Sequence, residues 1–565
     1  MIARAEAIAA LGSQEFDVVV IGGGITGAGV ALDAASRGYS VGLVEKGDYA
    51  SGTSSRSSKL VHGGLRYLQQ FDLGLVREAL LERQLMVALA PHLVHPLPLV
   101  VAAFEGQRPD RMVGLGLNMY DVLSIDKRRR RGRRGKGGES ERDESEEWAP
   151  ERHRMITGEE VLEYLPALGA RQPTGGYLFY DCQTDDSRLV LTVLAEAQRF
   201  GAVAANGVEV TDLVESGGRA TGVAVRDVDT GDSFTVRGHN VVNATGVWAD
   251  RIRPDELFDE AEIPRISPSR GTHITLPHSS LPLISGAIVP AGEGRSIFAL
   301  PWLGRTLVGT TDNDYEGDID AVAPELSDID YLLDAVNLYF LTELTVADLT
   351  GSFAGVRPLI ATGDPKKSVD ISRRAELYET SSGMVTITGG KLTTWRRMAA
   401  MAVDSIVERD GRDAPCRTHE IPLGQVVAPE DLVRVEGVAP EAYVALANRY
   451  GHEAIAVLEV AAENSDLTKP IVCDLPDILA EAVFAARHEQ VRCLSDVLLR
   501  RTRLGILAAP ELLDPGSDAP RRVAAAIAPE LGWDLARVQR ELDGWRLDAA
   551  REGVLATAIG PSKRL

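Results

Sequence analysis

The chain has 565 residues, of which 44% are hydrophobic and 25% are charged, and its formal net charge is −22. This length and composition are typical of a soluble globular protein with about two to four domains. The negative charge argues against nonspecific nucleic-acid binding, which needs clustered lysines and arginines, and the four cysteines form no C-x-x-C pair that would indicate a zinc site or an iron–sulfur cluster.

The N-terminus carries no sign of export. Residues 1–14 are rich in alanine and lack the basic segment, the long apolar core and the cleavage site of a secretory signal. No run of about 18 apolar residues could span a bilayer, and the small number of cysteines suits a reducing compartment. We therefore expect a cytoplasmic protein without a metal site, whose contact with any membrane is peripheral, on its cytoplasmic face.

Residues 16–45 predict the element around which the rest of the chain is organised. Val18–Ile21 is a short apolar run typical of a buried strand, and Gly22, Gly24 and Gly27 occupy the glycine places of the G-x-G-x-x-G fingerprint that opens a helix. These glycines allow a tight turn, the approach of a pyrophosphate to the helix N-terminus, and close packing of helix on strand. Glu45 ends the second expected strand, where a carboxylate can accept ribose hydroxyls. The stretch predicts a dinucleotide site; the alternative is an ordinary strand–helix–strand turn with an empty crevice.

A loop rich in serine and glycine follows at residues 47–67. Its small hydroxylated residues suit either a solvated loop or one whose amides and hydroxyls wrap a phosphate-bearing cofactor. The segment Ser57–Leu68 reads S-S-K-L-V-H-G-G-L-R-Y-L, and residues 22–29 read G-G-G-I-T-G-A-G. Both closely resemble signatures of the FAD-dependent glycerol-3-phosphate dehydrogenases. The resemblance implies that the dinucleotide is FAD.

The next part of the chain mixes helices with a charged insertion. Residues 75–90 predict an amphipathic helix that stops at a proline. Residues 127–147 join a basic tract to an acidic one and cannot bury apolar area, so we interpret them as a disordered surface loop. The functional alternative is contact with anionic lipid headgroups. Thr157–Glu160 predicts a capping box, and Asp186 is the expected N-cap of a helix that ends near Phe200.

The middle of the chain is rich in strands. Residues 208–236 predict a β-meander, and Val241–Asp250 predicts a buried strand and a glycine turn that, by the resemblance, lies against the adenine side of FAD. Residues 265–313 predict a second, antiparallel sheet that caps the flavin, before a helix at 327–341. Residues 384–395 predict another strand, a double-glycine turn and a helix start, where the helix N-terminus can stabilise negative charge on the flavin.

From residue 414 on, the pattern is helical and rich in alanine, which predicts a separate C-terminal domain. The strongest helical periods lie at residues 441–450, 453–463, 478–489, 493–504 and 535–552.

Together these elements predict an α/β fold. We expect a Rossmann-like, two-part FAD-binding domain of the glutathione-reductase/D-amino-acid-oxidase type, with an antiparallel β-sheet substrate cap and a C-terminal α-helical domain. The oxidoreductase region spans residues 1–410, with FAD-binding segments at about 16–75, 190–255 and 350–410 and cap segments at about 76–189 and 256–349; the helical domain spans residues 411–565.

The FAD contacts follow from matching the motifs residue by residue. They lie in the glycine turn, the serine-rich loop, the A-T-G element and the G-G-K-L-T turn. The implied set is Gly22, Gly24, Ile25, Thr26, Gly27, Glu45, Lys46, Thr53, Ser54, Ser55, Ser58, Lys59, Leu60, His62, Gly63, Gly64, Ala244, Thr245, Gly246, Gly390, Lys391, Leu392 and Thr393.

The implied substrate, sn-glycerol 3-phosphate, is a secondary alcohol with a phosphate dianion, so its site needs cations and a base. Arginine suits the phosphate because its planar fork binds oxygens bidentately and stays charged. The resemblance assigns His273, Arg357 and Lys391 to catalysis, and His273 is the first candidate for the base because its ordinary pKa lies near neutrality. Alternatively, Arg357 is a structural ion-pair residue and His273 an ordinary half-buried histidine. The substrate-binding set is Arg66, Tyr67, His273, Arg357, Arg373, Lys391, Thr393 and Thr394.

The reaction implied by the resemblance is hydride transfer from the carbinol carbon to flavin N5, which yields dihydroxyacetone phosphate. The electrons then pass to a quinone reached from the membrane surface. Two alternative enzymes share the fold: a glycerol-3-phosphate oxidase that reduces oxygen, and an FAD oxidase of amino or hydroxy acids. A third alternative is a flavin-binding protein without turnover. The sequence does not determine the oligomeric state in solution, and a homodimer is one option.

Overall fold

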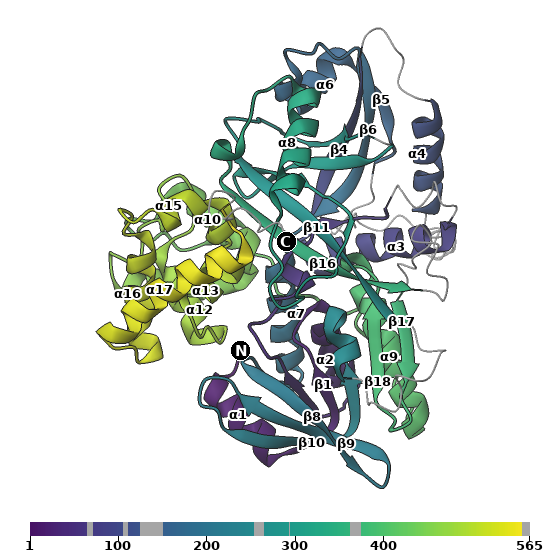
Figure 1. Ribbon diagram of the computed structural model, residues 1–565, viewed down its shortest axis with the longest axis vertical. Coiled ribbons are helices and arrows are strands. Elements are labelled where there is room, and N and C mark those ends of the chain that lie inside the picture. Colours follow the sequence, from purple (N-terminus) through teal and green to yellow (C-terminus); the bar gives the residue numbers. More distant parts are fainter. Residues whose placement is uncertain are drawn as a thin grey trace, which may run out of the picture.

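The computed structural model describes residues 1–64, 72–104, 111–124, 151–252, 265–292, 294–361 and 375–555. Two β-sheets follow one another along the long axis of the molecule, and the helices of the C-terminal part pack beside them (Figure 1). Three predicted site residues, Arg66, Tyr67 and Arg373, lie outside the described residues, as does the charged insertion 127–147.

The first sheet is built around a parallel core. Its order is β17-β18-β10-β1-β2-β7, and the strands β8 and β9 extend it beside β10. The parallel strands are β1 (Glu15–Ile21), β2 (Val41–Val44), β7 (Val203–Ala205), β10 (Ser233–Asn243) and β18 (Val385–Gly389). The antiparallel strands are β8 (Val208–Ser216), β9 (Arg219–Asp227) and β17 (Ala375–Glu379).

The apolar run in β1 is buried on both faces, which explains why it contains no polar residue. Side chains alternate along a strand, so Val18 and Val20 pack into one core and Val19 and Ile21 into another. The first core is covered by α2 (Ile25–Ser36), α7 (Asp186–Arg199) and α9 (Trp395–Asp410), and the second by α1 (Arg4–Ser13) and the β8–β10 meander.

The second sheet is mostly antiparallel, with the order β15-β11-β14-β13-β12-β4-β6-β3. One pair, β12 with β4, is parallel, and β16 and β5 pair with β11 and β6. Its strands are β3 (Leu60–Val61), β4 (His95–Ala103), β5 (Arg154–Thr157), β6 (Gly175–Gln183), β11 (Arg265–Pro277), β12 (Gly286–Pro290), β13 (Ser296–Trp302), β14 (Arg305–Gly309), β15 (Asn313–Asp314) and β16 (Gly351–Ala361). Thus β16, which lies within a predicted FAD-binding segment, hydrogen-bonds inside the cap sheet.

Helices cover the second sheet. The helices α6 (Gly158–Tyr164) and α8 (Leu326–Phe340) share one core with it, and α3 (Leu73–Leu89) and α4 (Arg111–Leu123) supply smaller clusters. The predicted capping box is present at the start of α6, because the Thr157 and Glu160 side chains and backbone amides bond reciprocally.

The C-terminal part is helical, as expected. Its helices are α10 (Pro440–Tyr450), α11 (Ala454–Glu463), α12 (Leu479–His488), α13 (Leu494–Asp496), α14 (Leu504–Leu507), α15 (Ala509–Leu513), α16 (Ala519–Leu531) and α17 (Leu535–Glu552). The continuous helix predicted over 493–504 is wrong. A π-helical turn, η10 (Val497–Arg501), and a left-handed Arg503 with φ of 67° divide it, and they turn three arginines inward.

The α/β fold class with a helical C-terminal domain is confirmed. None of the helices within the described ranges is long and apolar enough to cross a membrane.

Candidate functional site

A cavity of about 1590 Å³ lies where the two sheets and the C-terminal helices meet. It exceeds the roughly 300–1,000 Å³ of an ordinary small-ligand pocket, as a dinucleotide requires. Most of the predicted site residues line it: Gly22, Gly24, Ile25, Thr26, Glu45, Lys46, Thr53, Ser54, Ser58, Leu60, His62, Gly64, Ala244, Thr245, Gly246, His273, Arg357, Gly390, Lys391, Leu392 and Thr393.

The glycine turn has the backbone that the fingerprint predicts. Gly22 has a φ of +108°, and a Cβ there would lie 2.8 Å from the Ala244 carbonyl oxygen of the neighbouring strand. A Cβ on Gly27 would lie 1.9 Å from the Gly22 oxygen, so helix α2 can begin this close to β1 only with glycine. The turn therefore brings the N-terminus of α2 to the cavity wall, where it can bind a pyrophosphate. The first amide of the helix, that of Ile25, donates to Ser54 Oγ at 2.9 Å.

Glu45 ties the end of β2 to that turn. Its Oε2 accepts from the Gly23 amide at 2.7 Å, and its Oε1 accepts from the Gly47 amide at 2.7 Å. Burial raises the pKa of Glu45, and these two amides oppose the rise. Each oxygen keeps an acceptor position, so the carboxylate can still bind ribose hydroxyls.

His273 occupies the middle of β11, opposite Phe353 of β16 and Gly309 of β14. Its ring stacks on Phe353, with centroids 4.8 Å apart and an interplanar angle of 8°. Its Nε2 lies 2.8 Å from the Ser58 Oγ. Burial, together with the positive charges of Lys59 and Arg357, holds the pKa of His273 well below its ordinary value. The imidazole is therefore neutral at pH 7 and able to take up a proton.

Arg357 reaches the cavity from the strand beside His273. Its Nη1 donates to Asp312 Oδ1 and its Nη2 donates to Thr310 Oγ1, each at 3.1 Å. Its side chain is 27% exposed. The ion pair of the alternative interpretation of Arg357 is thus present, and the residue also lines the cavity.

The double-glycine turn after β18 joins the serine-rich loop at the cavity. Thr393 Oγ1 accepts from the His62 amide at 3.1 Å and donates to the His62 carbonyl at 3.2 Å. Lys391 precedes the 3₁₀ turn Leu392–Thr394, after which α9 begins at Trp395. The predicted strand, turn and helix start are confirmed, and they place an ammonium group and a helix N-terminus at the same wall.

Some predicted residues, although described, do not line the cavity: Gly27, Ser55, Lys59, Gly63 and Thr394. Lys59 is the clearest case, since its fully buried Nζ binds Asp186 Oδ1 and Oδ2 at 2.9 and 2.8 Å and the Ser55 carbonyl at 2.6 Å. Burial, with Arg503 as the next cause, lowers the pKa of Lys59 to about 7. The predicted N-cap is also wrong: Asp185 caps α7 through the Ser187 and Arg188 amides, which leaves Asp186 to pair with Lys59.

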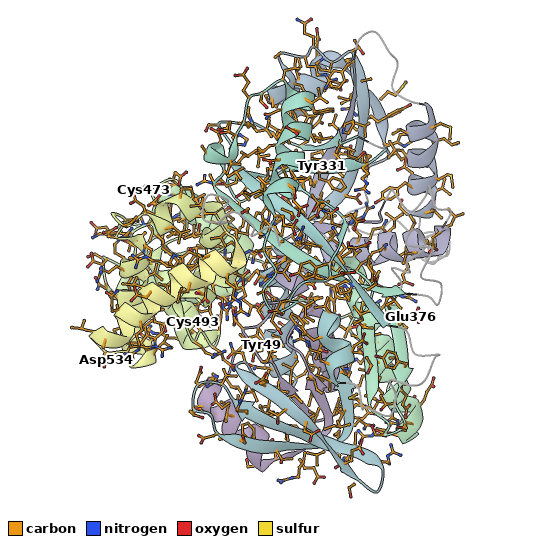
Figure 2. All side chains as sticks on the ribbon, viewed as in Figure 1. Tyr49, Tyr331, Glu376, Cys473, Cys493 and Asp534 are labelled. Carbon is orange, nitrogen blue, oxygen red and sulfur yellow. The ribbon has the colours of Figure 1, made fainter. Side chains whose placement is uncertain are left out.

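Sequence reasoning missed a buried ionic network between the cofactor loop and the C-terminal helices. Asp48 and Arg500 both line the cavity. Arg500 Nε donates to Asp48 Oδ2 at 2.5 Å, and Arg501 donates to both oxygens at 2.7 and 2.9 Å. Tyr49, labelled in Figure 2, donates to Gln490 Oε1 at 3.0 Å in the same interface. The signal available in the sequence is the run R-R-T-R at residues 500–503 within an otherwise leucine-rich segment.

Comparison with known proteins agrees with this geometry. A family model described as "FAD dependent oxidoreductase" matches residues 17–396, and one described as "C-terminal domain of alpha-glycerophosphate oxidase" matches residues 389–538. The chain is 39% identical to "Glycerol-3-phosphate dehydrogenase 2" of Mycobacterium tuberculosis, over 95% of this chain and 89% of that protein. It is 34% identical to "Aerobic glycerol-3-phosphate dehydrogenase" of Bacillus subtilis, over 86% and 87%.

Among solved structures, the glycerol-3-phosphate dehydrogenase from Bacillus halodurans complexed with FAD matches with a TM-score of 0.76 and 29% identity, over 97% of each chain. The glycine turn, Glu45 and the large cavity fit the same cofactor, so FAD is the cofactor of this protein. The chain belongs to the family of FAD-dependent oxidoreductases that includes the glycerol-3-phosphate dehydrogenases.

Proposed function

We propose that this protein oxidises sn-glycerol 3-phosphate to dihydroxyacetone phosphate with FAD and passes the electrons to a quinone. The observation that supports the proposal best is the pairing of β11 with β16, because it brings the His273 imidazole and the Arg357 guanidinium to one wall of the cofactor cavity. The names of the relatives support the same substrate.

Cations around the cavity suit a phosphate dianion. The Arg357 guanidinium offers paired donors, and Lys391, on the turn after β18, also lines the cavity. By the sequence resemblance, Arg373 joins the phosphate clamp, and Arg66 and Tyr67 contact the substrate. A carboxylate would also attract arginine, but an amino-acid oxidase has no need of the H-G-G-L-R-Y and G-G-K-L-T-T motifs together.

The oxidation of a secondary alcohol removes a hydride from carbon and a proton from oxygen. When bound, FAD supplies the hydride acceptor at flavin N5. His273 supplies the base, because burial and two nearby cations keep its ring neutral. Lys391 polarises the substrate oxygen.

The decisive test is anaerobic addition of sn-glycerol 3-phosphate to the purified holoenzyme. We expect the flavin absorbance to bleach, because the site binds the phosphate and removes the hydroxyl proton. Glycerol, which lacks the phosphate, is the matched control and should leave the flavin oxidised. Unchanged absorbance with sn-glycerol 3-phosphate would refute the proposed function.

The same sample shows whether the electron acceptor is a quinone or oxygen. Adding a soluble quinone to the bleached enzyme should reoxidise it far faster than adding air. Equal rates, or faster reoxidation by air, would identify a glycerol-3-phosphate oxidase instead.

A quinone acceptor requires access to a membrane, and α4 offers an apolar surface for it. Met112, Leu115 and Val122 on this helix are 72%, 55% and 66% exposed, whereas Leu117 and Tyr120 face the protein. The helix stands at the outer edge of the second sheet (Figure 1). The basic tract 127–136 follows it in the sequence, and each basic residue near an anionic membrane contributes about 1 kcal/mol. We place this surface on the cytoplasmic face of the membrane.

Replacing Met112, Leu115 and Val122 together by serine should reduce the fraction of protein that sediments with anionic vesicles, because the variant loses apolar area that would insert among the lipids. A matched control replaces Leu535 and Leu547 of α17, which are 89% and 73% exposed, by serine and should sediment like the unmodified protein. Equal sedimentation of all three proteins would contradict the assignment of α4.

A further inference from the structure

The two nitrogens of the His273 ring differ in what they can reach. Nε2 lies 2.8 Å from the Ser58 Oγ. Nδ1 is buried and has no hydrogen-bond partner among the described residues. The whole residue is only 2% exposed. Nδ1 is therefore closed off from a substrate, and the Ser58 hydroxyl lies at Nε2.

The ring is held so that this arrangement cannot easily change. Phe353 stacks on one face of the imidazole. At Gly309 the neighbouring strand β14 comes so close that a Cβ would lie 2.2 Å from His273 Cδ2. A ring packed between two strands cannot swing toward the cavity without moving the sheet. The Ser58 hydroxyl lies at Nε2 and at the cavity wall, so it offers a proton a route from the cavity to that nitrogen.

The two residues next to Ser58 in the chain both bind one buried carboxylate, that of Asp186. Asp186 Oδ2 accepts from the Ser57 amide at 3.1 Å and from the Ser57 Oγ at 2.7 Å. The same carboxylate binds the ammonium of Lys59, whose left-handed backbone has a φ of 61°. Arg503 also donates to Asp186 Oδ1, at 3.2 Å, and to the Ser55 carbonyl, at 2.8 Å. The residues before and after Ser58 are thus both anchored to Asp186. Ser58 lies at the cavity wall with its hydroxyl directed toward His273.

We propose that Ser58 is a catalytic residue that relays the substrate's hydroxyl proton to His273, and that Asp186 is a positioning residue that holds Ser58 in the relay. The inference rests on the proposed oxidation of sn-glycerol 3-phosphate and adds to it a route for the proton.

In the relay, the substrate O–H bond breaks and its proton binds Ser58 Oγ. At the same time, Ser58 gives its own hydroxyl proton to His273 Nε2, so the serine ends unchanged and the imidazole becomes an imidazolium. The carbinol C–H bond breaks with its electron pair, which leaves as hydride to the flavin as oxidant, and the carbon–oxygen bond becomes a carbonyl. One hydride and one proton leave the alcohol, so the products are the ketone, the reduced cofactor and protonated His273.

Three replacements of Ser58 test the relay. Valine and threonine have nearly the same shape and differ in the hydroxyl, and alanine removes the hydroxyl without adding bulk. The readouts are the rate constant of anaerobic flavin bleaching at saturating sn-glycerol 3-phosphate, the apparent substrate Kd, and the solvent deuterium isotope effect on bleaching. The flavin-to-protein absorbance ratio confirms that each variant holds FAD.

We expect Ser58→Val and Ser58→Ala to slow bleaching by about 10²–10⁴-fold, the usual contribution of general acid–base catalysis, with little change in substrate Kd. Ser58→Thr should restore most of the rate and the solvent isotope effect. Bleaching of the valine or alanine variant at the unmodified rate, or an equal loss in all three variants, would overturn the relay. If the unmodified enzyme itself does not bleach, the proposed function fails instead, so the two failures are distinguishable.

Asp186→Asn tests the positioning role. It should lower the bleaching rate constant, because the segment that holds Ser58 loses its anchor. It should not raise the substrate Kd, because the residues proposed to bind the phosphate are unchanged. An unchanged rate constant would remove Asp186 from the proposal. If the variant does not fold with FAD bound, the Ser58 series still decides the relay.

Discussion

Replacement of His273 by asparagine is expected to lower kcat by about 10²–10⁴-fold while FAD stays bound. Asparagine keeps a polar side chain of similar size but cannot accept a proton at pH 7. The substrate hydroxyl then has no base, and hydride departure would leave a protonated carbonyl. The measurement is anaerobic flavin bleaching at saturating substrate, with His239→Asn as a matched control on an exposed histidine.

The pH dependence of kcat/KM provides a second measurement of the role of His273 as the base. Burial, Lys59 and Arg357 depress the pKa of His273, so the ring loses its proton well below its ordinary value near 6.5. The His273 limb of kcat/KM should therefore lie on the acid side of pH 6.5, with activity lost as pH falls through it. A phosphate monoester ionises near a pKa of about 6 and produces a limb of its own. His273→Asn should abolish only the lower limb, and an unchanged rate and profile would eliminate His273 as the base.

The second large effect is expected at Asp48. Replacing it by asparagine should destabilise the protein by about 3–5 kcal/mol, the usual result of removing one partner from a buried ion pair. Asp48 is 3% exposed and faces Arg500 and Arg501 at 2.5 to 2.9 Å. The variant would leave two guanidinium groups buried without their shared counter-charge. Because Asp48 also lines the cavity, FAD should be released at a lower temperature, which the rise of flavin fluorescence on heating measures.

The loss of stability in acid provides a second test of the role of Asp48. Burial alone would raise its pKa, but Arg501 and Arg500 outweigh burial and hold the pKa below its ordinary range. A depressed pKa means that the stabilisation is present at neutral pH and is lost as pH falls below about 4. Asp48→Asn should therefore lose stability at pH 7 and show less further loss in acid. Asp466→Asn, at an exposed pair with Lys469, should change neither property. Equal release temperatures for all three proteins would contradict the role of Asp48.

Local signals predicted several secondary-structure elements correctly. The strand–glycine–helix run, the double-glycine turn and the capping box each depend on residues close together in the chain, and each is present. The resemblance added His273 and Arg357, which the pairing of β11 with β16 brings to one wall. Charge partners were harder to predict, because a lysine in a serine-rich loop looks the same whether it faces FAD or, as Lys59 does, a buried carboxylate.

By itself, the sequence determined the fold class, the cofactor turn and the residue types of the site, because backbone periodicity, glycine and acid spacing are local properties. Tertiary structure alone decided which side chains meet. It paired Asp48 with arginines from the far end of the chain and divided the helix predicted over 493–504. It also placed the Ser58 hydroxyl 2.8 Å from His273 Nε2 at the cavity wall. The physical reason is that a buried charge or hydroxyl pairs with groups that the folded core brings close to it. These groups can come from any part of the chain, so no short stretch of sequence identifies them.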